Sequence, residues 1–493
     1  MSSTTKKSFM YWQWRTIITT MIGYALFYFV RKNFSFAIPG LSAEYGITKT
    51  SFGIIMTIVT IVYGVSRFLN GFIADRLNAR YHMAVGLLLC AIANYAFGFG
   101  ADLSSLITGQ TSGPQFTNTM VLIFGVILII NNLFQGTGFP PVARLLSHWI
   151  PANELATKMS IWNTSHSIGA SLVAILCGYV MGTLGVNMAA NPEIVANIAA
   201  HLHVDMADAA RMQGVLESAA HVGAWRLCFW IPATIALVGA LGIFIFLRDT
   251  PSSVGLAEIH ETNKKGKGAN ADYKDFIRRK VFRNKWIWIL AIADFFVYIV
   301  RFAVLDWGPT FLKEARGMSL ANAGWTVAVF EIFGIIGMLV SGYATDKWLK
   351  GKAHHTCLYC MVGVAIFMTI FLMLPHGTTM FWMVIVLAMA GFFIYGPQAL
   401  IGIAAANQAT NRAAGAANGL IGMFGYASGI VSGIGVGIFV DLMNKVNPEK
   451  SWDYVFMGMI GIAIIGIFVF MLMWNAKADG YDEEHAGEEV TTN

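Results

Sequence analysis

The sequence predicts an all-α integral membrane protein with twelve transmembrane helices in two pseudo-symmetric six-helix halves. Of its 493 residues, 56% are hydrophobic and only 12% are charged, half the charged share of about 25% that a soluble globular domain carries. Apolar runs long enough to cross a bilayer follow one another along nearly the whole chain. A repeated pattern of charges divides these runs into two halves. The composition excludes a peripheral anchor and a single-span receptor.

Apolar runs bounded by charges or by Gly, Pro and Asn clusters number about twelve. They predict spans near 16–38, 52–73, 81–100, 120–142, 160–185, 225–247, 286–308, 321–344, 356–375, 379–403, 412–440 and 454–474. The first run follows the basic residues Lys6, Lys7 and Arg15, is long, and lacks a small-residue cleavage site. We therefore interpret it as a retained first span and not as a cleaved signal peptide.

Most Lys and Arg residues lie in the even-numbered connections between these spans. The positive-inside rule therefore predicts that both termini are cytoplasmic. Because orientation accounts for these cations, the net charge of +6 does not indicate a nucleic-acid partner.

The polar segment after the sixth span predicts a linker between the halves. The expected organisation is an N-terminal half at 1–247, a cytoplasmic linker at 248–285, a C-terminal half at 286–475 and an acidic cytoplasmic tail at 476–493. Loops near 101–119 and 186–222 should face outside. In the second loop, the alanine-rich and charged stretch around Met206–Glu217 favours a surface helix.

Two unrelated charged features recur at one spacing. The segment Gly71–Arg76 follows span two and its counterpart Gly342–Lys347 follows span eight, with acids offset by 346 − 75 = 271 residues. Two intramembrane arginines, Arg31 and Arg301, are offset by 301 − 31 = 270, which indicates duplication. The charged members of the segments are Asp75, Arg76, Asp346 and Lys347. They could form state-dependent salt bridges, or they could simply cap a helix.

Charged side chains within a membrane usually face a cavity and mark a substrate or ion path. Tyr24, Tyr28 and Arg31 share one helix face, and Asp294, Tyr298 and Arg301 repeat that spacing. Guanidinium is always charged and offers a planar fork of donors that matches phosphate. The pair predicts an oxyanion site between the halves. The alternative is that either arginine snorkels to an interface or pairs with Asp294 or Glu331.

Further polar residues share faces within the first half. Trp162 and His166 lie four residues apart in span five, as do Tyr63 and Arg67 in span two. A histidine could change protonation together with a phosphate, or it could be a packed core residue. Arg67 could contact substrate or sit at the cytoplasmic boundary.

Two further features of the sequence bear on function. His354, His355, Cys357 and Cys360 lie together without a second ligand pair, so we expect no metal site. The chain contains no Gly-Xaa4-Gly-Lys-[Ser/Thr] loop, which argues against ATP-driven transport.

Several motifs resemble one family over nearly the whole chain. They are Phe29-Val-Arg-Lys-Asn-Phe34, Gly136-Thr-Gly-Phe-Pro-Pro141, Trp162-Asn-Thr-Ser-His166, Arg248-Asp-Thr-Pro251, Val300-Arg-Phe-Ala-Val-Leu-Asp-Trp307 and Tyr395-Gly-Pro397. With the duplicated Gly…Asp-[Arg/Lys] segments, they resemble the organophosphate:phosphate antiporters of the major facilitator superfamily. The resemblance implies a non-enzymatic transporter of a bacterial inner membrane that exchanges a phosphate ester for inorganic phosphate. Neither a cofactor nor an oligomer is expected.

The resemblance also implies roles for individual residues. The family's phosphate-binding arginines correspond to Arg31 and Arg301, and its site histidine to His166. Its cavity tyrosines correspond to Tyr24, Tyr28, Tyr63, Tyr298, Tyr395 and Tyr426, and further charged family positions to Lys32, Asp306 and Glu331. Trp162 and Arg67 complete the predicted binding residues.

The match to individual branches of the family is mixed. Arg67 stands where glycerol-3-phosphate transporters have a lysine, and Asn418 and Ile421 replace an Asp/Lys pair of a hexose-phosphate transporter. Leu305-Asp-Trp307 favours glycerol 3-phosphate, whereas Gly396-Pro-Gln398 resembles the hexose-phosphate branch. Two other functions stay open: a membrane sensor of hexose phosphate, and a proton-coupled symporter with Asp294 and Glu331 as proton carriers.

Overall fold

The computed structural model describes residues 3–74, 77–150, 152–257, 275–375, 377–409, 413–448 and 450–477. These residues are almost entirely helical, and an antiparallel bridge between Val186 and Val222 is the one strand-like pairing found in them. Eleven segments of the described chain are long and apolar enough to span a membrane. The chain is therefore an all-α, multi-pass membrane protein, as the sequence predicts.

The helices of the first part are α1 (Ser3–Lys32), α2 (Phe34–Tyr45), α3 (Lys49–Ala74), α4 (Ala79–Gly98), α5 (Gly100–Thr108), α6 (Pro114–Gln135), α7 (Phe139–Trp149), α8 (Ala152–Thr183), α9 (Pro192–His201), α10 (Ala209–Ala219) and α11 (Ala224–Phe246). After short turns at Pro251–Val254 and Arg278–Phe282 come α13 (Lys285–Arg316), α14 (Leu320–Lys347), α15 (Ala353–Met373), α16 (Met380–Ala409), α17 (Ala414–Ala427), α18 (Val436–Val446) and α19 (Ser451–Met471).

Helix boundaries differ from the predicted spans in a few places. The span predicted at 16–38 falls on α1 and α2, which are separated at Asn33, and it is not among the eleven apolar segments. The span predicted at 120–142 is interrupted after Gln135, where Gly136 and Gly138 lead into the prolines of α7. The loop predicted at 101–119 contains α5, and the surface helix favoured in the second loop is α10. Residues 258–274 of the predicted linker and 478–493 of the predicted tail lie outside the described residues.

Pro397 lies inside helix α16 and does not end it. The helix continues from Met380 to Ala409. Gly396 instead permits close packing, because a Cβ there would lie 2.6 Å from Ser341 Oγ and 2.7 Å from Cys360 Sγ. The glycine is thus required by the approach of α16 to α14 and α15.

The chain packs as two compact units. Unit 1 comprises residues up to Thr262 together with Asp306–Ala328, and unit 2 comprises Asn263–Leu305 and the chain from Val329. The boundary therefore runs through α13 and α14, not through a loop.

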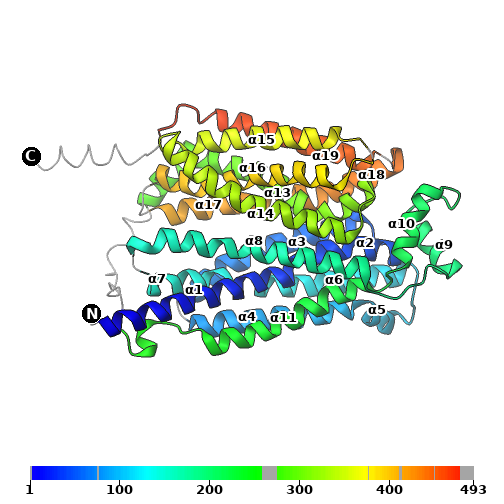
Figure 1. Cartoon of the computed structure of the whole chain (residues 1–493), viewed down its shortest axis with the longest axis horizontal. Coiled ribbons are helices and arrows are strands. Elements are labelled where there is room, and N and C mark those ends of the chain that lie inside the picture. Colours follow the sequence, from blue (N-terminus) through cyan, green and yellow to red (C-terminus); the bar gives the residue numbers. More distant parts are fainter. Residues whose placement is uncertain are drawn as a thin grey trace, which may run out of the picture. The chain divides into compact units, whose positions relative to one another are not determined.

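Unit 1 is built around stacked aromatic rings. Phe97 lies with its ring centroid 4.1 Å from that of Phe124 and 3.9 Å from that of Phe229. At one end, which we call the insert face, α9 and α10 lie beside α2 and share a small core with it that includes Ala43, Val195 and Val215. The opposite end, which we call the terminal face, holds the start of α1 and the end of α11 (Figure 1).

Candidate anion-binding site

Arg31 lies in the last turn of α1 and is partly exposed. Its guanidinium carbon is 3.8 Å from the centroid of the Tyr63 ring on α3 and 5.7 Å from that of Tyr28. Such stacking engages the flat face of the guanidinium, whereas carboxylates and phosphates bind along its edge. The ring of Tyr63 can therefore position the cation without competing for an anion.

A kink in α1 directly precedes this arginine. Val30 has non-helical dihedral angles (φ −95°, ψ 18°), and its carbonyl accepts hydrogen bonds from the side-chain amides of Asn94 (3.0 Å), Asn131 (2.9 Å) and Gln135 (3.5 Å). All three amides are buried. A kink frees a carbonyl from the helix ladder, and buried polar groups need partners. The amides thus stabilise the bend that aims Arg31.

These three amides are not among the residues that the sequence pattern predicts to be functional. A usable signal was present, because Asn94, Asn131 and Gln135 interrupt apolar runs, where an amide must find a partner. Their common partner is a main-chain oxygen, which no side-chain pattern reveals.

Aromatic side chains extend from Arg31 along the inner side of α1. The ring of Tyr24 lies 5.6 Å from that of Tyr28 and 4.9 Å from that of Trp162 on α8. The ring of His166 lies 5.8 Å from that of Tyr28. With Tyr63, the structure therefore brings five of the predicted binding residues together with Arg31 in unit 1.

Hydrogen bonds orient two members of this cluster. Trp162 donates from Nε1 to Thr20 Oγ1 at 3.1 Å. His166 Nδ1 is within hydrogen-bonding distance of the Asn163 carbonyl. Since a carbonyl can only accept, Nδ1 is the donor in this contact.

Arg67 of α3 is partly exposed, and its guanidinium carbon lies 4.5 Å from the centroid of the Phe139 ring. The ring centroids of Phe139 and Trp162 are in turn 5.7 Å apart. Arg67 therefore adds a second cation to the same aromatic cluster of unit 1.

Lys32 has a different partner. Its Nζ lies 2.6 Å from Asp306 Oδ1, and both side chains are mostly buried. Lys49 makes a second such pair with Glu314 at 2.8 Å. These ion pairs attach the end of α13 to unit 1, which places Lys32 and Asp306 among structural contacts of this conformation.

In unit 2, Arg301 is 5% exposed. Its Nη2 donates to the hydroxyl of Tyr395 at 3.0 Å, and its guanidinium carbon lies 4.8 Å from the Tyr395 ring centroid and 6.0 Å from that of Tyr298. Glu331 of α14 is fully buried and interacts electrostatically with Tyr395. Tyr395 thus lies between a cation and an acid.

Asp294 lies two helical turns before Arg301 on α13 and is 4% exposed. Its Oδ2 contacts α17, since a Cβ on Gly425 would lie 2.5 Å away. The neighbouring Tyr426 has its ring centroid 6.5 Å from that of Tyr298. The predicted face of Asp294, Tyr298 and Arg301 therefore packs against α17.

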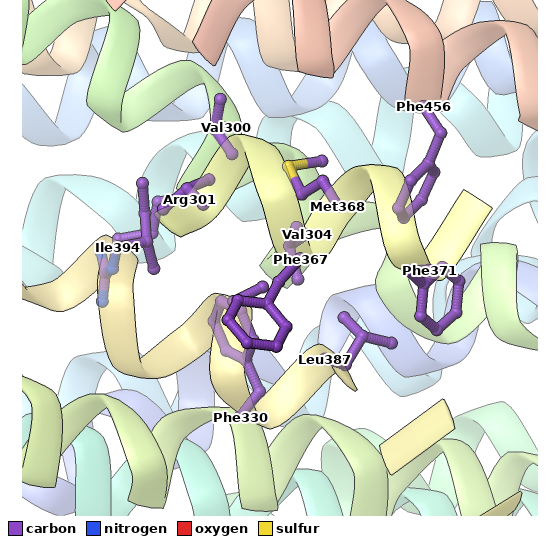
Figure 2. Close-up of a pocket in the computed structure, with 12 residues that line it drawn as sticks. Val300, Arg301, Val304, Phe330, Phe367, Met368, Phe371, Leu387, Ile394 and Phe456 are labelled. Carbon is purple, nitrogen blue, oxygen red and sulfur yellow. The ribbon is translucent and has the colours of Figure 1, made fainter. Parts of the chain in front are cut away.

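Arg301 also lines a mostly apolar pocket (Figure 2). Its other lining residues include phenylalanines from several helices, among them Phe330, Phe367 and Phe456. A phosphate transferred into apolar surroundings would lose its hydration without replacement. The apolar part of the pocket, beyond Arg301 itself, therefore does not suit an anion.

The remaining predicted positions are not assembled with these clusters. Asp75 and Arg76 lie outside the described residues, and Asp346 and Lys347 are exposed at the end of α14. The rings of His355 and Trp474 stack with their centroids 4.4 Å apart. Nε2 of His355 also forms a hydrogen bond with the main-chain carbonyl of Trp474. No group of three potential metal ligands occurs within the described ranges.

Aromatic rings thus hold Arg31 and Arg67 in unit 1, and the ring and hydroxyl of Tyr395 hold Arg301 in unit 2. Arg31 is accompanied by neutral aromatic residues and a histidine, and Arg301 by a hydroxyl and two buried carboxyl groups. Each arrangement can bind an oxyanion through charge-assisted hydrogen bonds.

Comparison with known proteins agrees with this chemistry. Residues 20–433 match the model of the Major Facilitator Superfamily. The chain is 34% identical to a glycerol-3-phosphate transporter of Bacillus subtilis, over 94% of this chain and 92% of the relative. It is 32% identical to a probable hexose phosphate transport protein of Chlamydia pneumoniae (96% and 93% covered). It is also 32% identical to the membrane sensor protein UhpC of Escherichia coli (86% and 85% covered).

The fold has counterparts among solved structures. A bacterial homologue of the human lysosomal transporter Spinster, in an inward-facing and unoccupied conformation, superposes with a TM-score of 0.67 at 14% sequence identity, covering 94% of this chain and 96% of that one. At this identity the likeness shows the fold alone. The chain belongs to the Major Facilitator Superfamily and, within it, to the organophosphate:phosphate antiporter family.

Proposed function

We propose that this protein is a secondary transporter of a bacterial inner membrane that exchanges a phosphate ester for inorganic phosphate. Glycerol 3-phosphate is the favoured ester and a hexose 6-phosphate the next. The observation that carries the proposal is the presence of one supported guanidinium in each unit, at repeat-equivalent positions of α1 and α13. Two relatives with phosphate-ester transport in their names support the substrate class.

The two arginines suggest how exchange arises. Two cations that share one site repel each other when the site is empty, and a bound phosphate dianion offsets that repulsion. A ligand changes a conformational equilibrium only through its different affinities for the two states. We therefore expect bound phosphate to lower the barrier of a rocker-switch transition between two accesses to the site.

This mechanism makes the loaded carrier return readily and the empty carrier seldom. The test is efflux of labelled phosphate from proteoliposomes, with and without phosphate outside. We expect external phosphate to accelerate efflux at least tenfold. Equal rates in both conditions would identify a uniporter or channel and overturn the proposal.

Substrate choice is tested by counterflow. Proteoliposomes loaded with phosphate are offered labelled glycerol 3-phosphate or glucose 6-phosphate, and the first should accumulate faster. Accumulation of neither ester, with saturable binding of a hexose phosphate to the purified protein, would instead indicate a sensor, the alternative that the relative UhpC supports. Uptake that requires an inward proton gradient would indicate a proton-coupled symporter.

A further inference from the structure

Three arginines of unit 1 converge on the end of one helix at the terminal face. Helices α1, α4 and α11 run side by side there (Figure 1). Arg15 of α1 donates from Nε to the Phe246 carbonyl at 3.1 Å, and Arg80 of α4 donates from Nε to the Phe244 carbonyl at 2.6 Å. Arg248, directly after α11, donates from Nη1 to the carbonyls of Ile245 and Leu247 at 2.9 and 2.7 Å.

The helix end alone cannot neutralise these cations. A helix C-terminus carries roughly half a negative charge, so more than two positive charges stay uncompensated. Over the described ranges, no carboxylate lies within ion-pair distance of the three guanidinium groups. The neighbouring Asp249 accepts from the Ala79 amide and pairs with Arg144 at 3.2 Å.

The three cations also act on one another electrostatically. Burial, followed by the charges of Arg80 and Arg15, lowers the pKa of Arg248. Capping of a helix C-terminus by basic residues is common, but a cap needs no third cation that repels the other two. An anion that compensates them all accounts for the cluster more completely.

The surroundings are those of a membrane interface. The guanidinium carbon of Arg15 lies 4.5 Å from the Trp12 ring centroid, that of Arg248 lies 5.9 Å from the same ring, and that of Arg80 lies 5.3 Å from the Tyr81 ring. Tyrosine and tryptophan gather at the level of lipid head groups. The cluster therefore lies at the height at which lipid phosphates lie.

The same three helices also expose apolar surface. It includes Ile18 and Ile22 of α1, Val85 of α4, and Val238 and Leu241 of α11. Together the cations and this surface match an amphiphile with an anionic head and hydrocarbon chains.

We infer that Arg15, Arg80 and Arg248 bind the phosphodiester head group of an anionic phospholipid, whose acyl chains lie on the exposed apolar surface of α1, α4 and α11. Each guanidinium has five N–H donors, so it can hold a phosphate oxygen while it bonds the end of α11. The lipid would fix α1 and α4 to α11. The inference is independent of the transported substrate.

The test is native mass spectrometry of the purified full-length protein, titrated with phosphatidylglycerol, phosphatidylcholine or inorganic phosphate. We expect phosphatidylglycerol to bind at least tenfold more tightly than phosphatidylcholine. The triple variant Arg15→Gln/Arg80→Gln/Arg248→Gln should lose that preference. The control Arg278→Gln/Arg279→Gln/Arg283→Gln removes the same charge from exposed positions and should change phosphatidylglycerol affinity less than twofold.

Three results would overturn the inference. They are equal affinity for both lipids, equal losses in the two triple variants, and displacement of phosphatidylglycerol by millimolar inorganic phosphate, which would indicate a free-anion site. If the triple variant does not fold, a photoactivatable phosphatidylglycerol is crosslinked to the wild type. Labelled peptides should then come from the terminal-face ends of α1, α4 and α11, and labelling spread evenly over all helices would contradict the site.

Discussion

Arg31 and Arg301 occupy equivalent positions in the two repeats, but their surroundings differ. Arg31 is partly exposed, stacks on Tyr63, and follows a kink held by three amides that do not titrate. Arg301 is buried, bonds the Tyr395 hydroxyl, and shares unit 2 with two buried carboxyl groups. Duplication thus kept the cation and changed its support. In unit 1 the packing of a ring and a helix kink positions Arg31. In unit 2 the groups around Arg301 are ones that can exchange protons.

The largest effect is expected from the arginines themselves. Arg31→Lys and Arg301→Lys should each lower exchange roughly 10- to 100-fold, because an ammonium keeps the charge but cannot reproduce the bidentate fork. Phosphate exchange in proteoliposomes measures this. The exposed Arg211 provides a control, since Arg211→Lys should be silent. Near-normal exchange by either variant would contradict the prediction that both arginines are needed for phosphate exchange.

The two tyrosines that support these arginines should respond differently to loss of the hydroxyl. Tyr63 presents its ring face to Arg31, so Tyr63→Phe should alter exchange less than twofold. Tyr395 accepts a hydrogen bond from Arg301, and Tyr395→Phe should lower exchange about fivefold, which corresponds to about 1 kcal/mol for one bond. Phosphate exchange by each variant, divided by that of the wild type, measures the difference. Equal effects would show that both arginines are held alike.

A third prediction concerns protonation on the unit 1 side. An imidazole ordinarily titrates near pH 6.5, and His166 adjoins the aromatic cluster of Arg31. If its protonation follows that of the ligand, His166→Gln should flatten the dependence of substrate affinity on pH between about 5.5 and 7.5. Substrate affinity of the wild type and of His166→Gln, measured across that pH range, tests the prediction. An unchanged profile would return His166 to a packing role.

The smallest effect on exchange is expected at the insert face, a region present in unit 1 only. The connection at 186–222 is folded, whereas the equivalent connection of unit 2 between α18 and α19 is a few residues long. Glu44, beyond the predicted first span, accepts from the Gly223 amide at 2.8 Å and from Trp225 Nε1 at 3.1 Å. Burial raises its pKa from 4.5 to about 7, although these two bonds and Arg226 oppose the shift.

Because Glu44 holds its proton more tightly in the folded state, its contribution to stability is present below about pH 4.5 and is lost as pH rises through about 7. The Tm of the wild type should therefore fall by several degrees between pH 5 and 8, and Glu44→Gln should remove that part of the slope. The exposed Glu193 on α9 is a control, since Glu193→Gln should keep it. Identical slopes for all three proteins would refute the assignment.

Much of the candidate site was predictable from sequence. An arginine, a histidine or an acid within an apolar run is visible without a structure, and so is the recurrence of Arg31 at Arg301. The support of these residues was not predictable. Asn131 acts on the main chain of Val30, and Tyr395 lies 94 residues from Arg301, so each relation depends on which helices pack together.

The sequence by itself determined that the chain is a membrane protein of duplicated plan. The length of an apolar segment and the positions of the charges beside it are local properties, and they decide whether and in which direction the segment inserts into a bilayer. It also located nearly every span to within a few residues. The tertiary structure alone decided that Asp306–Ala328 packs with unit 1, that α16 continues through Pro397, and that three arginines meet at the end of α11. These features depend on contacts between distant helices, and hydrophobic patterning carries no information about which small residue lets two helices approach.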